Sequence, residues 1–312
     1  MPKKFVPVMI TPFTPDARID FEMLEKLIDF YLAAGVKGLF ANCQSSEMFS
    51  ITNEERIALT KAVVKHVNGR VPIVASGSFG LTVKDKAEFT KKIYDTGIDA
   101  VVLITGHFAA IDEGDDKLLQ RLEKLLSLTG EIPLGFYECP APYKRLITPE
   151  ILKTLIATNR MRYHKDTSCS KEQVKAKLEV IRGSSMQFFD AHTPHAISSM
   201  QAGADGMSAI SGNFYPEVLV WLCENVDNPY KQKEVEWLQS ELARVDPLIH
   251  QAYPMSSKYF LKERGLPIHL ISRSQTFDPT PEQKQTLQSI LKTFRSWCEK
   301  LDIRELAYES VA

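Results

Sequence analysis

The segment GIDAVVLIT, residues 97–105, shows the pattern that decides the fold. A glycine ends one helical segment, and three residues later an apolar, β-branched run begins that is typical of a buried parallel strand. The same step recurs as GVKG at residues 35–38 and as GADG at residues 203–206. Each occurrence predicts that a helix ends and a strand begins directly after it, so the chain repeats one helix–strand unit.

Outward from this segment, short apolar runs alternate with longer runs of helical spacing. The predicted strands span residues 5–11, 37–42, 71–76, 100–105, 132–137, 161–165, 186–190 and 206–210. The predicted helices span residues 20–34, 53–67, 83–96, 115–128, 149–157, 171–181, 194–202 and 216–223. Because eight strand–helix units close a parallel barrel, the pattern predicts an α/β fold of the (β/α)8 TIM barrel type.

The rest of the chain, after the eighth strand–helix unit, is a C-terminal helical extension. Three helices are predicted over residues 232–250, 255–263 and 281–300, and prolines and a glycine separate them. We expect a barrel domain over residues 1–226 and a helical domain over residues 227–312 packed on it, since no low-complexity linker joins them. An open doubly wound sheet is the alternative, but it favours a glycine-rich phosphate loop where this chain has PFTP, residues 12–15.

Composition excludes several classes of protein. The chain has 312 residues, 44% of them hydrophobic, and a formal net charge of -1, so it lacks the basic surplus of nucleic-acid-binding proteins. No apolar run approaches the roughly 20 residues that span a bilayer. Five widely spaced cysteines, an odd number, argue against a disulfide framework. We therefore expect a cytoplasmic protein that binds neither nucleic acids nor membranes.

Lys165 is the most unusual residue at a predicted strand end. In parallel barrels the active site lies at the C-terminal ends of the strands, and Lys165 ends the apolar strand over residues 161–165. Burial would lower the pKa of this lysine, and a neutral amine attacks a ketone to form an imine. The alternative is an ordinary surface lysine just past a strand, and position alone does not decide between the two.

Two further predicted strand ends carry suitable polar groups. Tyr137 ends the fifth strand, and a phenol there could move the protons that imine formation requires, although it could also be an ordinary core tyrosine. QSS, residues 44–46, follows the second strand. Its hydroxyl and backbone N–H groups could bind a carboxylate, or it could form a simple turn.

Five motifs in order resemble the dihydrodipicolinate synthase / N-acetylneuraminate lyase family, along essentially the whole chain. They are TPF at 11–13, SSE at 45–47 with TNEER at 52–56, FYECP at 136–140, KDTS at 165–168, and GADG at 203–206 with Asn213 and PE at 216–217.

The resemblance implies a class I aldolase-type lyase that forms a Schiff base between Lys165 and pyruvate or a related 2-oxo acid. Tyr137 would relay protons. Ser45 and the backbone of Ser46 would bind the substrate carboxylate, and the carbonyl of Ser208 would lie near the imine. The family further implies an aldehyde partner, no metal or organic cofactor, and a homo-oligomer, either a tetramer or a dimer.

Several positions depart from the family pattern, and the departures leave the aldehyde partner open. Gln44 stands where the family usually has a hydroxyl residue that binds substrate and relays protons. His107 and Phe108 stand where many members carry a tyrosine from a neighbouring subunit, and His192 replaces the acidic residues of sialic acid lyases. We assign these three positions to the acceptor side. APY, residues 141–143, replaces the arginine of the synthases. Dihydrodipicolinate synthase proper (4-hydroxy-tetrahydrodipicolinate synthase) and a 2-keto-3-deoxy sugar acid or sialic acid type lyase remain alternatives.

Two alternatives of other classes also remain. A zinc enzyme could draw on three of the cysteines and histidines near predicted strand ends, although their spacing does not match a common metal motif. These residues are Cys43, Cys139, Cys169, His107, His164 and His192. A non-catalytic 2-oxo acid binding protein is favoured by the altered relay positions, Gln44 and Phe108.

Overall fold

The computed structural model describes residues 2–274 and 278–306. Eight parallel strands form one sheet in the order β1-β8-β7-β6-β5-β4-β3-β2. The strands are β1 (Lys4–Phe5), β2 (Leu39–Phe40), β3 (Ile73–Ser76), β4 (Ala100–Ile104), β5 (Leu134–Tyr137), β6 (Met161–Asp166), β7 (Gln187–Asp190) and β8 (Gly206–Met207). The sheet closes between its two ends, where Val8 and Phe40 form a parallel bridge and Lys37 N donates to Phe5 O at 3.0 Å. The prediction of a (β/α)8 barrel is confirmed.

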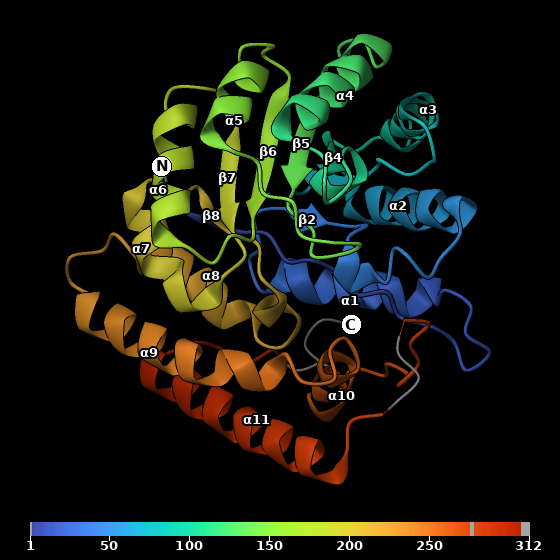
Figure 1. Ribbon diagram of the computed structural model, residues 1–312. Helices are drawn as coiled ribbons and strands as arrows, with labels where there is room; N and C mark the ends of the chain where they lie inside the picture. The colour runs from blue at the N-terminus through green and yellow to red at the C-terminus, as the bar shows by residue number, and fades with distance from the viewer. Residues whose placement is uncertain (1, 275–277, 307–312) are drawn as a thin grey trace.

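Eight helices follow the strands in turn and surround them (Figure 1). They are α1 (Phe21–Ala33), α2 (Asn53–Val67), α3 (Val83–Tyr94), α4 (Asp115–Leu128), α5 (Pro149–Ile156), α6 (Lys171–Ile181), α7 (Ala196–Ala202) and α8 (Pro216–Asn225). Local signals fix several of their ends. Thr52 and Glu55 form a reciprocal capping box at the start of α2, and Gly97 follows α3 with a φ of +96°, a conformation that glycine adopts without strain.

The first and last strands are shorter than the sequence pattern predicts. β1 stops at Phe5, because Pro7 has no N–H to donate and the chain regains only a single bridge at Val8. β8 stops at Met207, where the prediction ran to residue 210, and a 3₁₀ turn follows at Ile210–Asn213. Gly206 has a specific role in this pairing, because a Cβ atom there would lie 1.8 Å from the carbonyl oxygen of Lys4.

The C-terminal extension forms α9 (Gln232–Ile249), α10 (Met255–Glu263) and α11 (Pro281–Leu301), which lie along one side of the barrel (Figure 1). The side chain of Gln239 on α9 donates to Thr193 O at 2.9 Å and accepts from Ile197 N at 3.0 Å, so α9 is tied to the segment after β7. A domain boundary at residues 226/227 stays a prediction. None of the described helices combines the length and the apolar character that a membrane crossing requires.

Candidate active site

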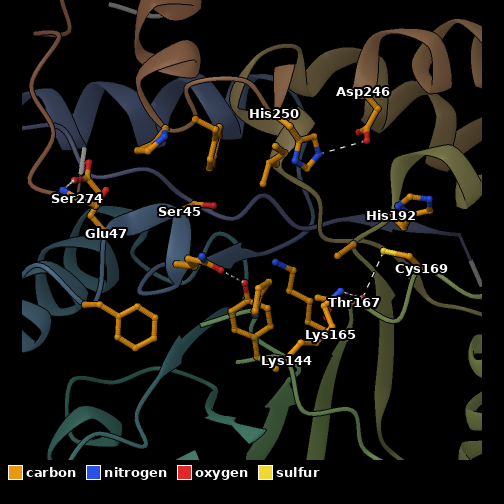
Figure 2. Close-up of a pocket in the computed structure, with 18 of the residues that line it drawn as sticks. Ser45, Glu47, Lys144, Lys165, Thr167, Cys169, His192, Asp246, His250 and Ser274 are labelled. Atoms are coloured by element: carbon orange, nitrogen blue, oxygen red, sulfur yellow. Dashed lines mark hydrogen bonds and ion pairs between the residues drawn. The ribbon is translucent and has the colours of Figure 1, made fainter. Parts of the chain in front are cut away.

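A cavity of about 510 Å³ lies at the C-terminal ends of the strands. Segments after β2, β5, β6 and β7 form its walls, together with the end of α9 and the connection to α10. Four residues predicted for the 2-oxo acid side of the site line it: Lys165, Tyr137, Gln44 and Ser45. Figure 2 shows the amine of Lys165 pointing into the space below Ser45. The fold therefore brings the central predicted residues into one site.

Lys165 and Tyr137 are register partners on adjacent parallel strands, so their side chains project from the same face. The Nζ atom of Lys165 lies 4.3 Å from the centre of the Tyr137 ring. Lys165 is only 4% exposed, and no described carboxylate forms an ion pair with it. Burial lowers the pKa of Lys165 to about 8. At neutral pH roughly one molecule in ten then carries the neutral, nucleophilic amine.

Gln44 accepts two hydrogen bonds through one atom. The hydroxyl of Tyr137 donates to Gln44 Oε1 at 3.4 Å, and the thiol of Cys139 donates to the same oxygen at 3.5 Å. Burial raises the pKa of Tyr137 well above its usual value and that of Cys139 to about 11, so both stay protonated near neutrality. An amide oxygen accepts hydrogen bonds but carries no proton that it could pass on. The hydrogen-bond chain that begins at Tyr137 therefore ends at Gln44.

The three serines predicted to bind substrate occupy different environments. Ser45 lines the cavity, and so does Tyr253 from the connection between α9 and α10. Ser46 is fully buried, and its hydroxyl lies 2.7 Å and 3.0 Å from two backbone carbonyl oxygens, so it holds the turn that presents Ser45. Ser208 is buried after β8, where its hydroxyl accepts from Tyr163 at 3.0 Å. Substrate contacts by Ser46 and Ser208 stay predictions.

Of the three residues assigned to the acceptor side, only His192 lines the cavity. His107 lies 2.6 Å through Nδ1 from the carbonyl oxygen of Ser78, so it donates there. Its ring packs at 5.9 Å against Phe49, which does line the cavity. Phe108 is 1% exposed and belongs to the hydrophobic core. Within this chain His107 and Phe108 thus stand behind the cavity wall.

Lys144 is a cavity residue that the sequence reasoning missed. Its ammonium donates to Thr167 O at 2.8 Å, which holds the side chain along the wall below Lys165 (Figure 2). The neighbouring Arg145 turns the other way and forms an ion pair of 2.7 Å with Asp115. Nothing in the local sequence distinguishes these two cations, because the loop conformation alone decides which one faces the cavity.

The end of α9 supplies two more residues that the sequence reasoning missed. His250 Nε2 lies 3.4 Å from Asp246 Oδ2, and both residues line the cavity. Figure 2 shows them on the same side of the cavity as His192 and Cys169. They reach this place only because α9 packs across the segment after β7, which a reading of local spacing does not reveal.

A second charged cluster lies on the outer side of β5 and β6. The ammonium of Lys177 lies 2.6 Å from Asp166 Oδ2 and also contacts the carboxylate of Glu138, and all three side chains are fully buried. His164 Nε2 lies 3.7 Å from Glu138 and 3.8 Å from Asp166. Because strand residues alternate between faces, His164 and Asp166 point away from the side that Lys165 occupies.

This cluster bears on the metal hypothesis. Within the described ranges, the one group of three potential ligands is Glu138, His164 and Asp166, whose ligand atoms lie within 4.8 Å of one another. Lys177 already contacts both carboxylates of that group. Of the six residues that the hypothesis named, only His164 belongs to it; the others are Cys43, Cys139, Cys169, His107 and His192.

A sequence model of the dihydrodipicolinate synthetase family matches residues 1–294. The chain belongs to this family. It is 27% identical to the 4-hydroxy-tetrahydrodipicolinate synthase of Oceanobacillus iheyensis, across 93% of this chain and 97% of that protein. It is 29% identical to the putative 2-dehydro-3-deoxy-D-gluconate aldolase YagE of Escherichia coli, across 69% of this chain and 71% of that protein.

Solved structures of the family share the fold. The crystal structure of YagE in complex with pyruvate superposes with a TM-score of 0.84 at 22% identity and covers 94% of this chain and 98% of that one. The 4-hydroxy-tetrahydrodipicolinate synthase of Methylacidiphilum fumariolicum gives a TM-score of 0.85 at 19% identity, with coverages of 96% and 98%. Members of the family are lyases of the aldolase or synthase type, and the chain is a carbon–carbon lyase. The two relatives carry the names of different reactions, so membership alone leaves the aldehyde partner open.

Proposed function

We propose that Lys165 forms a Schiff base with pyruvate or a related 2-oxo acid and that the enzyme then forms or breaks a carbon–carbon bond with an aldehyde. One observation carries the proposal. A buried lysine, with its pKa lowered to about 8, stands beside a buried phenol at the ends of neighbouring barrel strands and lines a cavity. A neutral amine in such a place is an activated nucleophile for a ketone.

Each nearby group has a role in this proposal. The amine of Lys165 attacks the keto carbon, and the oxygen leaves as water once it has been protonated. The protonated imine takes up the electron pair of the carbon–carbon bond one carbon further on, so cleavage gives an aldehyde and an enamine. In reverse, the pyruvate imine loses a proton from its methyl carbon, and the enamine so formed adds to an aldehyde. Tyr137 stays protonated and can donate a hydrogen bond to the departing oxygen, while Ser45 can bind the carboxylate of the 2-oxo acid.

Reductive trapping tests this proposal. Sodium borohydride reduces an imine to a stable amine, so pyruvate and borohydride together should inactivate the enzyme, and neither alone should. The adduct should form more slowly in Tyr137→Phe, with the thermal unfolding midpoint little changed. An equal trapping rate in wild type and Tyr137→Phe would remove Tyr137 from the mechanism. An adduct without a product from any aldehyde would favour the non-catalytic binding protein.

For the acceptor we propose an uncharged, hydroxylated aldehyde, which corresponds to a 2-keto-3-deoxy sugar acid type reaction. Asp246 adds a carboxylate to the same cavity lining as Lys144, so a carboxylate-bearing aldehyde meets a negative charge there as well as a positive one. Carboxylate, imidazole and ammonium groups do form hydrogen bonds with hydroxyls. The relative YagE is named as a putative 2-dehydro-3-deoxy-D-gluconate aldolase, which fits this choice. A dihydrodipicolinate synthase would need an arginine in this region to bind the carboxylate of its aldehyde, but Arg145 forms an ion pair with Asp115.

We also propose that the enzyme is a cytoplasmic homo-oligomer, a dimer or a tetramer. Leu81 is 95% exposed and Ile111 is 77% exposed, and Leu81 lines a hollow of about 500 Å³ together with Ala110, the neighbour of Ile111. Large exposed apolar side chains around a hollow favour burial against a second copy. The five cysteines are all free thiols, which agrees with a reducing compartment.

A further inference from the structure

Glu47 is a carboxylate at the rim of the cavity that the proposed reaction does not use. It directly follows the short 3₁₀ turn Gln44–Ser46, and its backbone has a left-handed conformation with a φ of +58°. A residue other than glycine keeps such a conformation where its surroundings fix it. The residue borders the cavity, yet its side chain is fully buried. Figure 2 shows Glu47 beside Ser274 at one edge of the cavity.

The carboxylate of Glu47 is bound by the C-terminal extension. Its Oε1 atom accepts from the ammonium of Lys258, on α10, at 2.7 Å. Its Oε2 atom accepts from the hydroxyl of Ser272 at 2.7 Å and from the backbone N–H groups of residues 273 and 274 at 2.6 Å and 2.8 Å. One cation therefore balances the charge of Glu47, and the segment after α10 supplies three further donors.

The segment of residues 272–274 is itself attached to the barrel. The guanidinium of Arg273 donates to both carboxylate oxygens of Glu55, at the start of α2, at 2.8 Å each. It also lies 5.0 Å from the centre of the Phe13 ring, and the ammonium of Lys258 lies 4.7 Å from the same ring. Both distances are typical of cation–π contacts. The donors that bind Glu47 are thus held in place by contacts away from the cavity.

The turn that presents Ser45 is consequently fastened on two sides. Ser46 fastens it to the barrel, through its hydroxyl and through its carbonyl oxygen, which accepts from the hydroxyl of Thr11 at 2.8 Å. Glu47 fastens it to the extension. Gln44 and Ser45, the residues of this turn that line the cavity, precede the two fastened positions directly in the chain.

We propose that Glu47 is a positioning residue that makes Lys165 selective for ketones that carry a carboxylate. By fastening the turn to the extension, it holds Ser45 where the carboxylate of a 2-oxo acid binds. Lys165 itself stands on β6 and does not depend on this turn. The inference rests on the proposed Schiff base and on the proposed role of Ser45, and it adds what keeps the carboxylate side of the site in place.

Glu47→Gln tests the proposal, because it keeps the shape of the side chain and replaces one carboxylate oxygen by an NH2 group. That group must face either the ammonium of Lys258 or the donors of residues 272–274, and two donors form no hydrogen bond with each other. The turn should then shift, and a binding group that is displaced by about 1 Å can cost about 10²-fold.

Pyruvate and acetone provide the readout, since they differ only in the carboxylate or methyl group on the keto carbon. Sodium cyanoborohydride traps the imine of either ketone, and the second-order rates of adduct formation are compared by mass spectrometry. In Glu47→Gln we expect the rate with pyruvate to fall by about 10- to 100-fold and the rate with acetone to stay almost unchanged. A loss of general stability would instead lower both rates together.

Glu217→Gln is the matched control. Glu217, on α8, pairs with Arg264, directly after α10, so the same substitution breaks another buried ion pair between the barrel and the extension. Glu217 lies outside the cavity lining. Its variant should lose stability in urea titration and keep the wild-type ratio of the two trapping rates.

Arg273→Met is a second variant that weakens the same attachment from outside the cavity lining. It removes the bonds to Glu55 and leaves Glu47 and the backbone donors in the chain. The preference for pyruvate should fall in the same direction as in Glu47→Gln, by a smaller factor. If Glu47→Gln does not fold, the ratio measured for Arg273→Met decides in its place.

The contrary outcomes are distinct. An unchanged ratio in Glu47→Gln, or an equal loss with both ketones, would show that Glu47 does not position the carboxylate side of the site. A control variant Glu217→Gln that loses the preference as strongly would equally overturn the inference, because any loosening of the extension would then suffice. If wild type forms no adduct with either ketone, the proposed Schiff base itself fails.

Discussion

Lys177 places its ammonium nitrogen 2.6 Å from Asp166 Oδ2, on the face of β6 opposite to the one that carries Lys165. The same ammonium contacts the carboxylate of Glu138, the residue after Tyr137. Glu138 also accepts from the backbone N–H groups of residues 147 and 167, at 2.9 Å and 3.1 Å. A buried cation thus joins the ends of the two strands whose inner faces present the phenol and the amine.

We expect Lys177→Met to destabilise the enzyme strongly. Removing the ammonium leaves two fully buried carboxylates without their cation, and breaking a buried pair in this way typically costs about 3–5 kcal/mol. The free energy of unfolding from urea titration measures the loss. Lys231→Met is the control, because its contact with Glu234 is partly exposed to solvent and should matter little. Equal stability of the two variants would show that the cluster does not hold the strand ends together.

The pH dependence of imine formation should follow the amine of Lys165. Burial lowers its pKa to about 8, and only the neutral form attacks, so the neutral fraction rises as the pH rises towards 8. The second-order rate of trapping with pyruvate should increase by roughly tenfold per pH unit below 8 and level off above it. Initial rates between pH 6 and pH 9.5 at subsaturating pyruvate check this. A rate that is flat across the range, or that falls as the pH rises, would exclude a lysine of this pKa as the nucleophile.

Asp246→Asn should weaken the use of hydroxylated aldehydes selectively. A hydroxyl that donates to a carboxylate contributes about 1.5–3 kcal/mol, so kcat/KM for glyceraldehyde should fall by about 10- to 100-fold. Propionaldehyde has the same chain length without hydroxyls and should be affected far less. Glu234→Gln changes the same helix away from the cavity and serves as the control. Equal losses for both aldehydes, or a wild-type preference for a carboxylate-bearing aldehyde, would contradict the proposed acceptor.

Leu81→Glu should dissociate the proposed oligomer. The substitution places a charge at a side chain that is 95% exposed in the single chain but would be buried against a second copy. Light scattering after size-exclusion chromatography gives the mass of the particle. Tyr230→Glu changes another highly exposed hydrophobic residue, far along the chain, and should leave the mass unchanged. A monomeric wild type, or an unaltered mass for Leu81→Glu, would contradict the proposed surface.

The sequence alone predicted those parts of the site that depend on the barrel repeat. Lys165 and Tyr137 stand at strand ends, and parallel pairing of β5 with β6 makes them neighbours without any further information. Ser45 follows the same logic, since the turn after β2 opens at the same rim. The middle strands also match closely, because continuous apolar runs mark them, whereas β1 and β8 are cut short by a proline and a turn.

The rest of the site depends on packing that local spacing does not encode. Tyr253 and Asp246 lie in the C-terminal extension and meet the barrel rim only because Gln239 and its helix dock on the segment after β7. Lys144 faces the cavity and Arg145 faces Asp115 only because of the conformation of the loop that carries both residues. Such contacts are long-range, and a single sequence gives no signal for them.

Peptide mapping of the reduced adduct tests the Schiff base most directly. Wild type treated with pyruvate and sodium borohydride should carry one added mass, located by tandem mass spectrometry on the peptide that contains Lys165. Lys144→Ala, which removes another lysine that lines the cavity, should still form that adduct, and Lys165→Ala should form none. An adduct that forms in Lys165→Ala as readily as in wild type would contradict the assignment of Lys165 as the imine-forming residue.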